Sequence, residues 1–295
     1  MLFGGNYIEI PVSVQTLGAF WAGALRLGLA SLSMLVLTLA IKGRFPRGRA
    51  IPFVLLYGSL GFSGNLALLY LGEVKVSPDT AVVVFASSPL WVMLFSRVVR
   101  TEKLSLKGAI GAFVAFFGVA VIFEGALSQN VPYSYLLLVL GGAVSYSVGL
   151  VAFAKAKEVD PQIDPLAVNC VAFALAACIL LALALLYGEV PSLPSTSDAQ
   201  FAIVYLVFAT VVGYGILATI IKKIRATYAA YSSILIPVVT IIESSLIGLR
   251  EPTAWFYVGV VIITIGVLAS GELALPLSRT AVRETSNMSE MQHRH

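Results

Sequence analysis

Charged residues are scarce in this chain of 295 residues: Asp, Glu, Lys and Arg together make up 12% of it. Soluble domains average about 25%. Hydrophobic residues make up 59% of the chain, and its mean hydropathy is +0.94. Long apolar runs at this density predict a polytopic all-α membrane protein, because only helices satisfy their own backbone groups within lipid.

Histidine and cysteine are also nearly missing. The two histidines, His293 and His295, stand in a polar tail, which leaves the apolar region without a His-based nucleophile triad or a HExxH zinc motif. Cys170 and Cys178 are eight residues apart in one apolar segment, too distant for a disulfide within one helix, and we interpret them as packing residues. We therefore expect neither an enzyme nor a resident cofactor or metal.

An internal repeat organises what is present. Residues 81–119 and 229–267 carry the same pattern of apolar run, proline, apolar run, charged turn and glycine-spaced apolar run. At one common offset of 148, Ala81 matches Ala229, Pro89 matches Pro237, Gly111 matches Gly259 and Gly118 matches Gly266. Two matching halves in an apolar chain are typical of internally repeated transporters. The paired glycines are interpreted as faces for close helix packing.

Ten apolar spans are predicted, five in each half. They cover residues 1–13, 18–41, 51–72, 79–99, 107–123, 133–154, 165–187, 199–221, 226–248 and 253–271. Most are about 20 residues long, enough to cross about 30 Å of hydrocarbon. The predicted domains are therefore a first repeat at 1–123 and a second repeat at 133–271. Residues 272–295 are predicted to form a disordered cytoplasmic tail.

Basic residues gather in every second loop, which predicts the orientation. One set of loops and the tail hold 16 of the 19 Lys and Arg residues, whereas the opposite set holds Lys75 and Arg250. By the positive-inside rule, both termini are expected in the cytoplasm. An odd number of spans per half makes the repeat inverted. Because the basic residues fall in short loops, the net charge of +4 does not indicate nucleic-acid binding.

The first span looks truncated when the two halves are compared. Aligning residues 3–7 (FGGNY) with residues 146–150 (YSVGL) places the start of an equivalent helix about ten residues before Met1. We expect the native start to lie upstream of Met1.

Several local motifs resemble one known family. FGGNY at residues 3–7 resembles the "WGsN" start of the first helix of the EamA domain, with Phe3 in place of Trp, and ALRLGLA around Arg26 resembles the "lRf..a" of its second helix. The helix prolines, the following turn glutamates and the late Gly-Val pairs are similar as well. The chain is thus identified as a member of the ten-span branch of the drug/metabolite transporter superfamily. This resemblance implies alternating access to a central cavity, often for export of amino acids or other metabolites.

Three charged residues fall within the apolar spans: Glu9, Arg26 and Glu243. A charge inside a membrane costs at least about 2.5 kcal/mol on insertion scales, so it is usually buried, paired or functional. Counted along their helices, all three lie in the outer half of the bilayer, with Arg26 about 12 Å from the outer end. We predict that Arg26 pairs with Glu243 or Glu9 and that substrate or a proton opens the pair. A static ion pair that fixes helix packing is the alternative.

Two prolines and several polar residues complete the candidate site. Pro89 and Pro237 lie within predicted helices, where proline removes a backbone hydrogen bond, and are interpreted as hinges. Polar groups near the middle of the spans are candidates for substrate contacts, although single hydroxyls often bond to their own helix. These candidates are Asn6, Asn65, Tyr70, Ser88, Trp91, Tyr146, Thr210, Tyr214, Tyr231 and Ser232.

These observations predict a secondary transporter in the cell membrane that exports a small metabolite, such as an amino acid or a related compound. No P-loop or other ATP motif is present, so coupling to protons or another solute gradient is expected, or none. The expected partners are a small-molecule substrate, the lipid bilayer and protons. A sugar-phosphate or nucleotide-sugar exchanger is an alternative, as is a non-transport membrane protein. A sugar-phosphate or nucleotide-sugar exchanger would need several basic residues in its cavity, and Arg26 is the single basic residue within the predicted spans that lies inside the bilayer.

Overall fold

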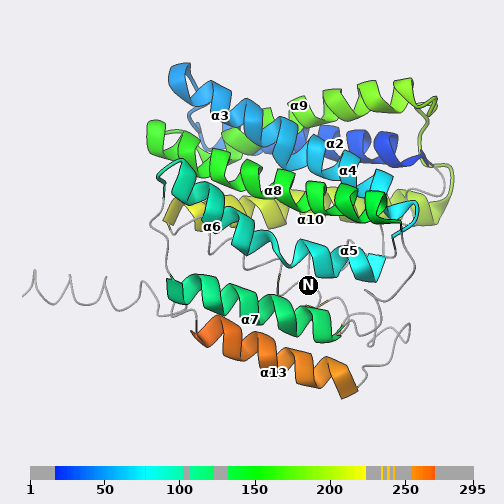
Figure 1. The fold of residues 1–295 in the computed structure, drawn as a ribbon. Coiled ribbons are helices and arrows are strands. Elements are labelled where there is room, and N and C mark those ends of the chain that lie inside the picture. Colours follow the sequence, from blue (N-terminus) through cyan, green and yellow to red (C-terminus); the bar gives the residue numbers. More distant parts are fainter. Residues whose placement is uncertain are drawn as a thin grey trace, which may run out of the picture.

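The computed structural model describes residues 17–76, 78–101, 106–122, 132–223 and 254–269, together with the single positions 234, 238, 239 and 242. Every regular element within these residues is helical, and the helices stack in layers (Figure 1). The prediction of an all-helical chain is confirmed for this part of the protein.

The elements follow one another with short connections. In chain order they are α2 (Ala19–Ala40), η1 (Gly48–Ala50), α3 (Ile51–Leu56), η2 (Tyr57–Gly64), α4 (Asn65–Glu73), α5 (Pro78–Phe85), α6 (Ser88–Val98), α7 (Leu106–Ile122), α8 (Tyr133–Val159), α9 (Pro165–Leu186), α10 (Ser197–Lys223) and α13 (Ala254–Ala269).

Five helical stretches are long and apolar enough to cross a membrane, and three shorter apolar helices accompany them in the described residues. The long stretches are Ala19–Ala40, Gly48–Glu73, Tyr133–Val159, Pro165–Leu186 and Ser197–Leu217, and the shorter ones are Val83–Val98, Leu106–Val121 and Ala254–Ala269. All eight coincide with predicted spans. The predicted span at residues 1–13 and most of the span at 226–248 lie outside the described residues.

Helices α2 and α9 form an antiparallel pair, one from each half of the chain. The contacts run in opposite directions along the two helices. A Cβ built on Gly23 would lie 3.1 Å from Leu180, and the hydroxyl of Ser31 donates to the carbonyl of Cys170 at 2.9 Å. Cys170 is thus buried against α2, in agreement with its interpretation as a packing residue.

Helices α7 and α13 form a second antiparallel pair, and their contact is reciprocal. A Cβ on Gly118 would lie 2.8 Å from the backbone nitrogen of Ile263 and 2.9 Å from the carbonyl oxygen of Gly259. A Cβ on Gly266 would lie 2.5 Å from the backbone nitrogen of Ala115 and 2.7 Å from the carbonyl oxygen of Gly111.

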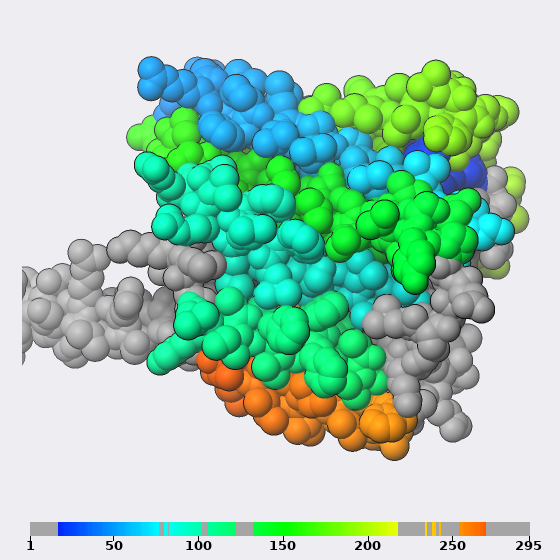
Figure 2. Space-filling model, viewed as in Figure 1, coloured from blue at the N-terminus to red at the C-terminus, as the bar shows by residue number. Residues whose placement is uncertain are grey.

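The two contacts are related by the offset of 148. Gly118 in α7 corresponds to Gly266 in α13, and their partners Ala115 and Gly111 in α7 correspond to Ile263 and Gly259 in α13. The offset read from the sequence therefore recurs in space. In the space-filling view, α7 lies between α6 and α13 (Figure 2).

The stretch between α3 and α4 is a π-helix, η2, in which each backbone hydrogen bond spans five residues instead of the four of an α-helix. Glycines let its backbone approach two neighbours. A Cβ on Gly58 would lie 2.7 Å from the carbonyl oxygen of Ala172 in α9, and Gly61 meets Gly149 of α8 backbone to backbone. The predicted continuous span at 51–72 is thus a helix with a widened middle, crossed closely by α8 and α9.

The predicted span at 79–99 is two helices instead of one bent helix. α5 ends at Phe85 and α6 begins at Ser88, which places Pro89 in the first turn of α6, where its missing N–H costs nothing. Serine hydroxyls donate to the carbonyls at the end of α5, one of which, that of Val84, also accepts from Ser87 N at 3.1 Å. Ser87 Oγ donates to the carbonyl of Val84 at 2.6 Å, and Ser88 Oγ donates to that of Phe85 at 2.5 Å.

Substituting Gly118 by Ala is expected to lower the free energy of unfolding by about 1–3 kcal/mol, the usual cost of overpacking. The added Cβ would meet backbone atoms of α13, which cannot rotate away as a side chain does. The measurement is the apparent unfolding temperature of the purified protein in detergent. Gly28→Ala is the matched control, because a Cβ there has only the Cβ of Ala177 at 3.9 Å, an ordinary contact. Equal unfolding temperatures for the two variants would contradict the tight α7–α13 contact.

Candidate functional site

Arg26 on α2 is buried among the helices, with 7% of its surface exposed. Its Nε donates a hydrogen bond of 2.7 Å to Oγ1 of Thr210 on α10. The Thr210 hydroxyl in turn donates to the carbonyl of Leu206 at 2.6 Å, which orients its lone pairs toward the guanidinium. Two predicted site residues, one from each half, are therefore in direct contact.

Two tyrosines surround this contact. Tyr70 on α4 and Tyr214 on α10 both lie within electrostatic range of the Arg26 charge. Tyr70 is packed against α2 one turn before Arg26, since a Cβ built on Gly23 would lie 3.7 Å from its hydroxyl oxygen. Arg26, Thr210, Tyr70 and Tyr214 form one group, which we call the Arg26 site.

A layer of aromatic and amide side chains supports the Arg26 site. The ring of Tyr214 packs edge-on against Phe62, with centroids 4.9 Å apart, and against Phe173 at 5.7 Å. Asn169 on α9 donates from Nδ2 to the Tyr214 carbonyl at 3.1 Å and accepts from the Tyr57 hydroxyl at 3.2 Å.

Asn169 and Tyr57 were absent from the predicted site. The sequence carries a signal for Asn169, because it is an amide in the otherwise apolar run PLAVNCVAFALA; the structure adds that it is fully buried.

The Arg26 site combines a delocalised cation with hydroxyl groups in an apolar setting. A guanidinium has five N–H donors arranged to match a carboxylate or phosphate. Within the described residues, Thr210 is its hydrogen-bond partner and no acidic side chain forms an ion pair with it. Its chemistry suits an anion or the carboxylate of a zwitterion.

Asn65 is not part of the Arg26 site. It lies five positions from Tyr70 on α4, about 140° around the helix. Its side chain is packed on α8, where a Cβ on Gly142 would lie 3.6 Å from Oδ1. This packing places Asn65 in the α4–α8 contact, and its buried Oδ1 has no hydrogen-bond partner among the described residues.

Ser88, Trp91 and Tyr146 gather elsewhere, around the break between α5 and α6. The indole Nε1 of Trp91 donates to Ser87 Oγ at 3.1 Å. The ring of Tyr146 on α8 lies 6.4 Å from that of Phe85. Together with the bond from Ser88 to Phe85, these contacts serve the helix break, and substrate roles for Ser88, Trp91 and Tyr146 stay predictions.

The remaining predicted site residues lie outside the described residues. These are Glu243, Glu9, Asn6, Tyr231, Ser232 and the hinge residue Pro237. The predicted pairing of Arg26 with Glu243 or Glu9 is therefore untested.

The first turn of α2 is fixed by a residue from the second half. Both carboxylate oxygens of Glu189, in the loop after α9, accept backbone hydrogen bonds, from Phe20 N at 3.2 Å and Trp21 N at 2.7 Å. The Trp21 indole donates to the Ser192 carbonyl at 2.7 Å. These bonds tie the N-terminal end of α2, including Trp21, to the loop after α9. We call this end of the α2–α9 pair the Glu189 end.

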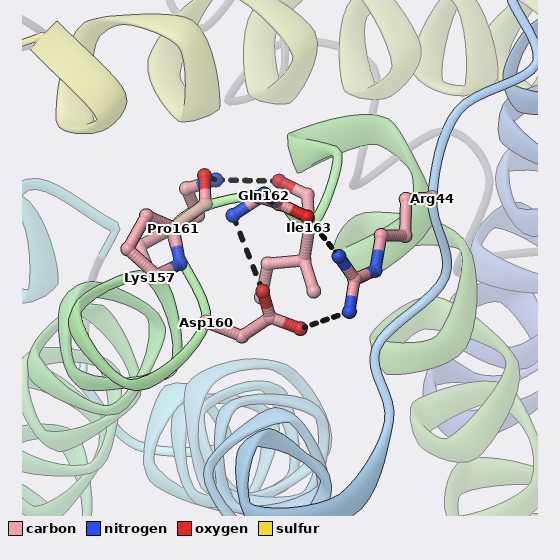
Figure 3. Close-up of polar contacts among 6 residues, drawn as sticks. All are labelled: Arg44, Lys157, Asp160, Pro161, Gln162 and Ile163. Carbon is pink, nitrogen blue, oxygen red and sulfur yellow. Dashed lines mark hydrogen bonds and ion pairs between the residues drawn. The ribbon is translucent and has the colours of Figure 1, made fainter.

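The opposite end of the α2–α9 pair is also tied, and we call it the Arg44 end (Figure 3). Arg44, after α2, forms an ion pair of 3.5 Å with Asp160 and donates to Gln162, both in the loop between α8 and α9. The buried ammonium group of Lys157 donates to the carbonyls of Pro161, at 3.0 Å, and Ile163 within the same loop. A backbone bond of 2.9 Å joins Asp164 N to the Arg44 carbonyl.

The apolar helices, the antiparallel pairs and the buried cation define a multi-pass membrane protein with a polar centre. The chain belongs to the EamA-like transporter family, whose model matches residues 1–124 and 133–271. The family prediction, including the drug/metabolite transporter superfamily, is confirmed.

Individual relatives agree with this family. The chain is 28% identical over 270 residues to an uncharacterized transporter of Bacillus subtilis, covering 88% of this chain and 87% of that protein. It is 24% identical to a probable amino-acid metabolite efflux pump of Escherichia coli, covering 90% of each chain. A solved crystal structure matches with a TM-score of 0.78 at 19% identity, covering 92% of this chain and 93% of that one, which supports the fold alone.

Replacing Lys157 by Met is expected to destabilise the protein by about 1–3 kcal/mol, because the carbonyls of Pro161 and of the buried Ile163 lose a charged donor. Arg44→Met is the matched variant at the same end. Its side chain is 48% exposed, and an exposed ion pair contributes about 0–1 kcal/mol. Thermal unfolding of both variants in detergent measures the difference, and a larger loss for Arg44→Met would contradict this ranking.

Proposed function

We propose that the protein is a secondary transporter that exports a small metabolite bearing a carboxylate, an amino acid or a related compound. The observation that carries this proposal is the Arg26 site, where a buried guanidinium bonds to a hydroxyl and to no described acid. Burying such a charge is costly unless a partner neutralises it. A substrate carboxylate would be that partner.

The relatives support the substrate class. The Escherichia coli relative is named a probable amino-acid metabolite efflux pump, and the same description is given to a relative from Salmonella typhimurium that is 25% identical to this chain. At a sequence identity of 24–25%, the names of these relatives suggest a class of substrate for this chain but not a single compound. The described residues bring no Lys or second Arg to Arg26, so a sugar-phosphate or nucleotide-sugar exchanger has less support.

Two inverted repeats of five helices are the architecture we propose for this transport. The repeats would cover residues 1–123 and 133–271, followed by the tail at 272–295. The reciprocal α7–α13 contact supports this arrangement, because both of its halves obey the offset of 148 and the two helices run antiparallel. Alternating access would then act at the interface between the repeats, where α2 meets α9 and α10.

The Arg44 end is proposed to face the cytoplasm of a cell membrane. The loops and helix ends there hold Lys42, Arg44, Arg47, Arg49, Lys155 and Lys157, and α6 ends on the same side with Arg97 and Arg100 (Figure 1). A cluster of basic residues on one side marks the cytoplasmic side. Both termini would share it.

The role of the Arg26 site is tested by replacing Thr210 with Val. Valine keeps the shape of the side chain but removes one hydrogen bond to a charged group, worth about 1.5 kcal/mol. The KM for substrate is therefore expected to rise roughly tenfold. Initial rates of exchange of an isotope-labelled mixture of the protein amino acids in proteoliposomes measure this. Arg26→Gln is expected to abolish exchange, because the neutral amide brings no positive charge to a substrate carboxylate.

Thr38→Val is the matched control. Thr38 is also fully buried and its hydroxyl bonds to the carbonyl four residues earlier, Met34 O at 2.7 Å, but its hydrogen-bond partners do not include Arg26. Its exchange rates should stay within about twofold of wild type. Equal rates in Thr210→Val and Thr38→Val would contradict a substrate role for the Arg26 site. An absence of exchange in wild type would favour a non-transport membrane protein.

A further inference from the structure

Helices α2, α6 and α9 end in the same arrangement, the Schellman motif. In this motif two backbone N–H groups beyond the helix donate to carbonyls of its last turn, and the first of them belongs to a residue with positive φ. These bonds are Lys42 N to Leu39 O at 3.1 Å and Gly43 N to Thr38 O at 2.8 Å in α2, Arg100 N to Arg97 O at 3.3 Å and Thr101 N to Ser96 O at 3.0 Å in α6, and Gly188 N to Leu185 O at 3.2 Å and Glu189 N to Ala184 O at 2.8 Å in α9. The residues with positive φ are Lys42 at 54°, Arg100 at 58° and Gly188 at 75°.

Glycine is the residue that this position favours, because it has no Cβ to clash with the backbone at positive φ. Gly188 follows the preference at the Glu189 end. Lys42 and Arg100 do not, and they are the non-glycine residues with positive φ in the part of the chain that the structure describes. Both lie on the side of the Arg44 end (Figure 1). Since Gly188 forms the same pair of bonds without strain, the motif itself does not require the two cations.

No partner among the described residues explains why Lys42 and Arg100 are charged. Neither side chain forms an ion pair or a hydrogen bond there. Asp160, an acid at the same end, is paired with Arg44 instead. The dipole of α6 already has Arg97 in the last turn of the helix. The charge of Arg100 therefore has no evident use within the fold.

Both cations stand directly beyond side chains that face lipid. Ile41 precedes Lys42 and is 56% exposed, and Val98, two residues before Arg100, is 69% exposed. Strongly exposed apolar side chains at the end of an apolar helix lie against the hydrocarbon of the bilayer. Long Lys and Arg side chains at such a helix end extend to the level of the lipid headgroups.

Three further arginines accompany them. Arg47 and Arg49 flank the start of η1, and Arg97 lies in the last turn of α6. All three are exposed, and within the described residues their side chains form no ion pair or hydrogen bond. We call Lys42, Arg47, Arg49, Arg97 and Arg100 the basic rim. A cluster of four to eight cations beside a membrane span is the usual composition of a surface that attracts anionic lipids.

We propose that the basic rim binds the headgroup phosphates of anionic phospholipids, with Lys42 and Arg100 as its principal contacts. A phosphate accepts charge-assisted hydrogen bonds from both ammonium and guanidinium groups. These bonds supply the stabilisation that offsets the strained backbone at the two positions. A zwitterionic headgroup binds less well, because its own cation neutralises the phosphate. This binding needs no substrate and is independent of the proposed transport function.

The test is thermal unfolding of the purified protein in a neutral detergent with added phosphatidylglycerol. The lipid concentration that gives half of the rise in unfolding temperature measures the affinity. Wild type is expected to show a larger rise with phosphatidylglycerol than with phosphatidylcholine. Sodium phosphate and glycerol 3-phosphate at the same concentrations should give no rise. An equal rise with phosphatidylcholine, or with either free phosphate, would overturn the proposal.

Lys42→Gly combined with Arg100→Gly removes both charges and both strained side chains. The half-saturating concentration of phosphatidylglycerol should rise by about tenfold or more, since each basic residue near an anionic surface is worth about fivefold in binding. Without lipid, the same variant should unfold at the wild-type temperature or above it, because glycine relieves the backbone. An unchanged affinity for phosphatidylglycerol would overturn the proposal. So would a lower unfolding temperature without lipid, which would mean that the two cations serve the fold itself.

Two further variants are controls. Lys42→Arg combined with Arg100→Lys keeps both charges and should keep the wild-type affinity. Lys75→Gln removes an exposed lysine after α4, in the opposite set of loops, that also follows a lipid-facing residue, Val74, but lacks the positive φ. Its affinity for phosphatidylglycerol should equal that of wild type. A loss in either control as large as in the glycine variant would overturn the proposal.

Discussion

The structure depends on one constraint: a guanidinium must be accommodated among apolar helices. Arg26 meets this constraint with the Thr210 hydroxyl and the nearby tyrosines, all contributed by helices that also pack against α2 or α9. The aromatic rings behind Tyr214 and the amide of Asn169 hold these polar groups in place. A binding group whose own position is fixed in this way loses little entropy when a ligand arrives.

Around that centre, irregular backbone is tolerated because its polar groups are satisfied locally. At the break before Pro89, the hydroxyls of Ser87 and Ser88 donate to the last carbonyls of α5, and α8 and α9 pack closely on the glycines of the π-helix η2. Backbone of this kind survives at membrane depth only where protein surrounds it. Ser87 and Ser88 near the α5–α6 break therefore have a structural role that does not depend on substrate binding.

Much of the fold could be predicted from the sequence, because hydropathy and the offset of 148 both reflect strong physical demands. Span boundaries followed from apolar length, and Gly118 and Gly266 were expected to mark close packing. The site was harder. Asn65 and Tyr70 looked equivalent as polar residues in one span, yet they point to different neighbours, and periodicity alone does not say which face of α4 meets α2. Asn169 stood out as an amide in an apolar run, but its partners Tyr57 and Tyr214 are known only from the structure.

The reciprocal contact between α7 and α13 has a consequence for how the chain is assembled. The same surface patch occurs once in each half and meets its own copy, as in the isologous interface of a twofold-symmetric dimer. A homodimer interface has in effect been built inside a single polypeptide. A sequence change in α7 therefore alters one side of that interface alone, and the two copies are free to diverge, which a true homodimer never permits.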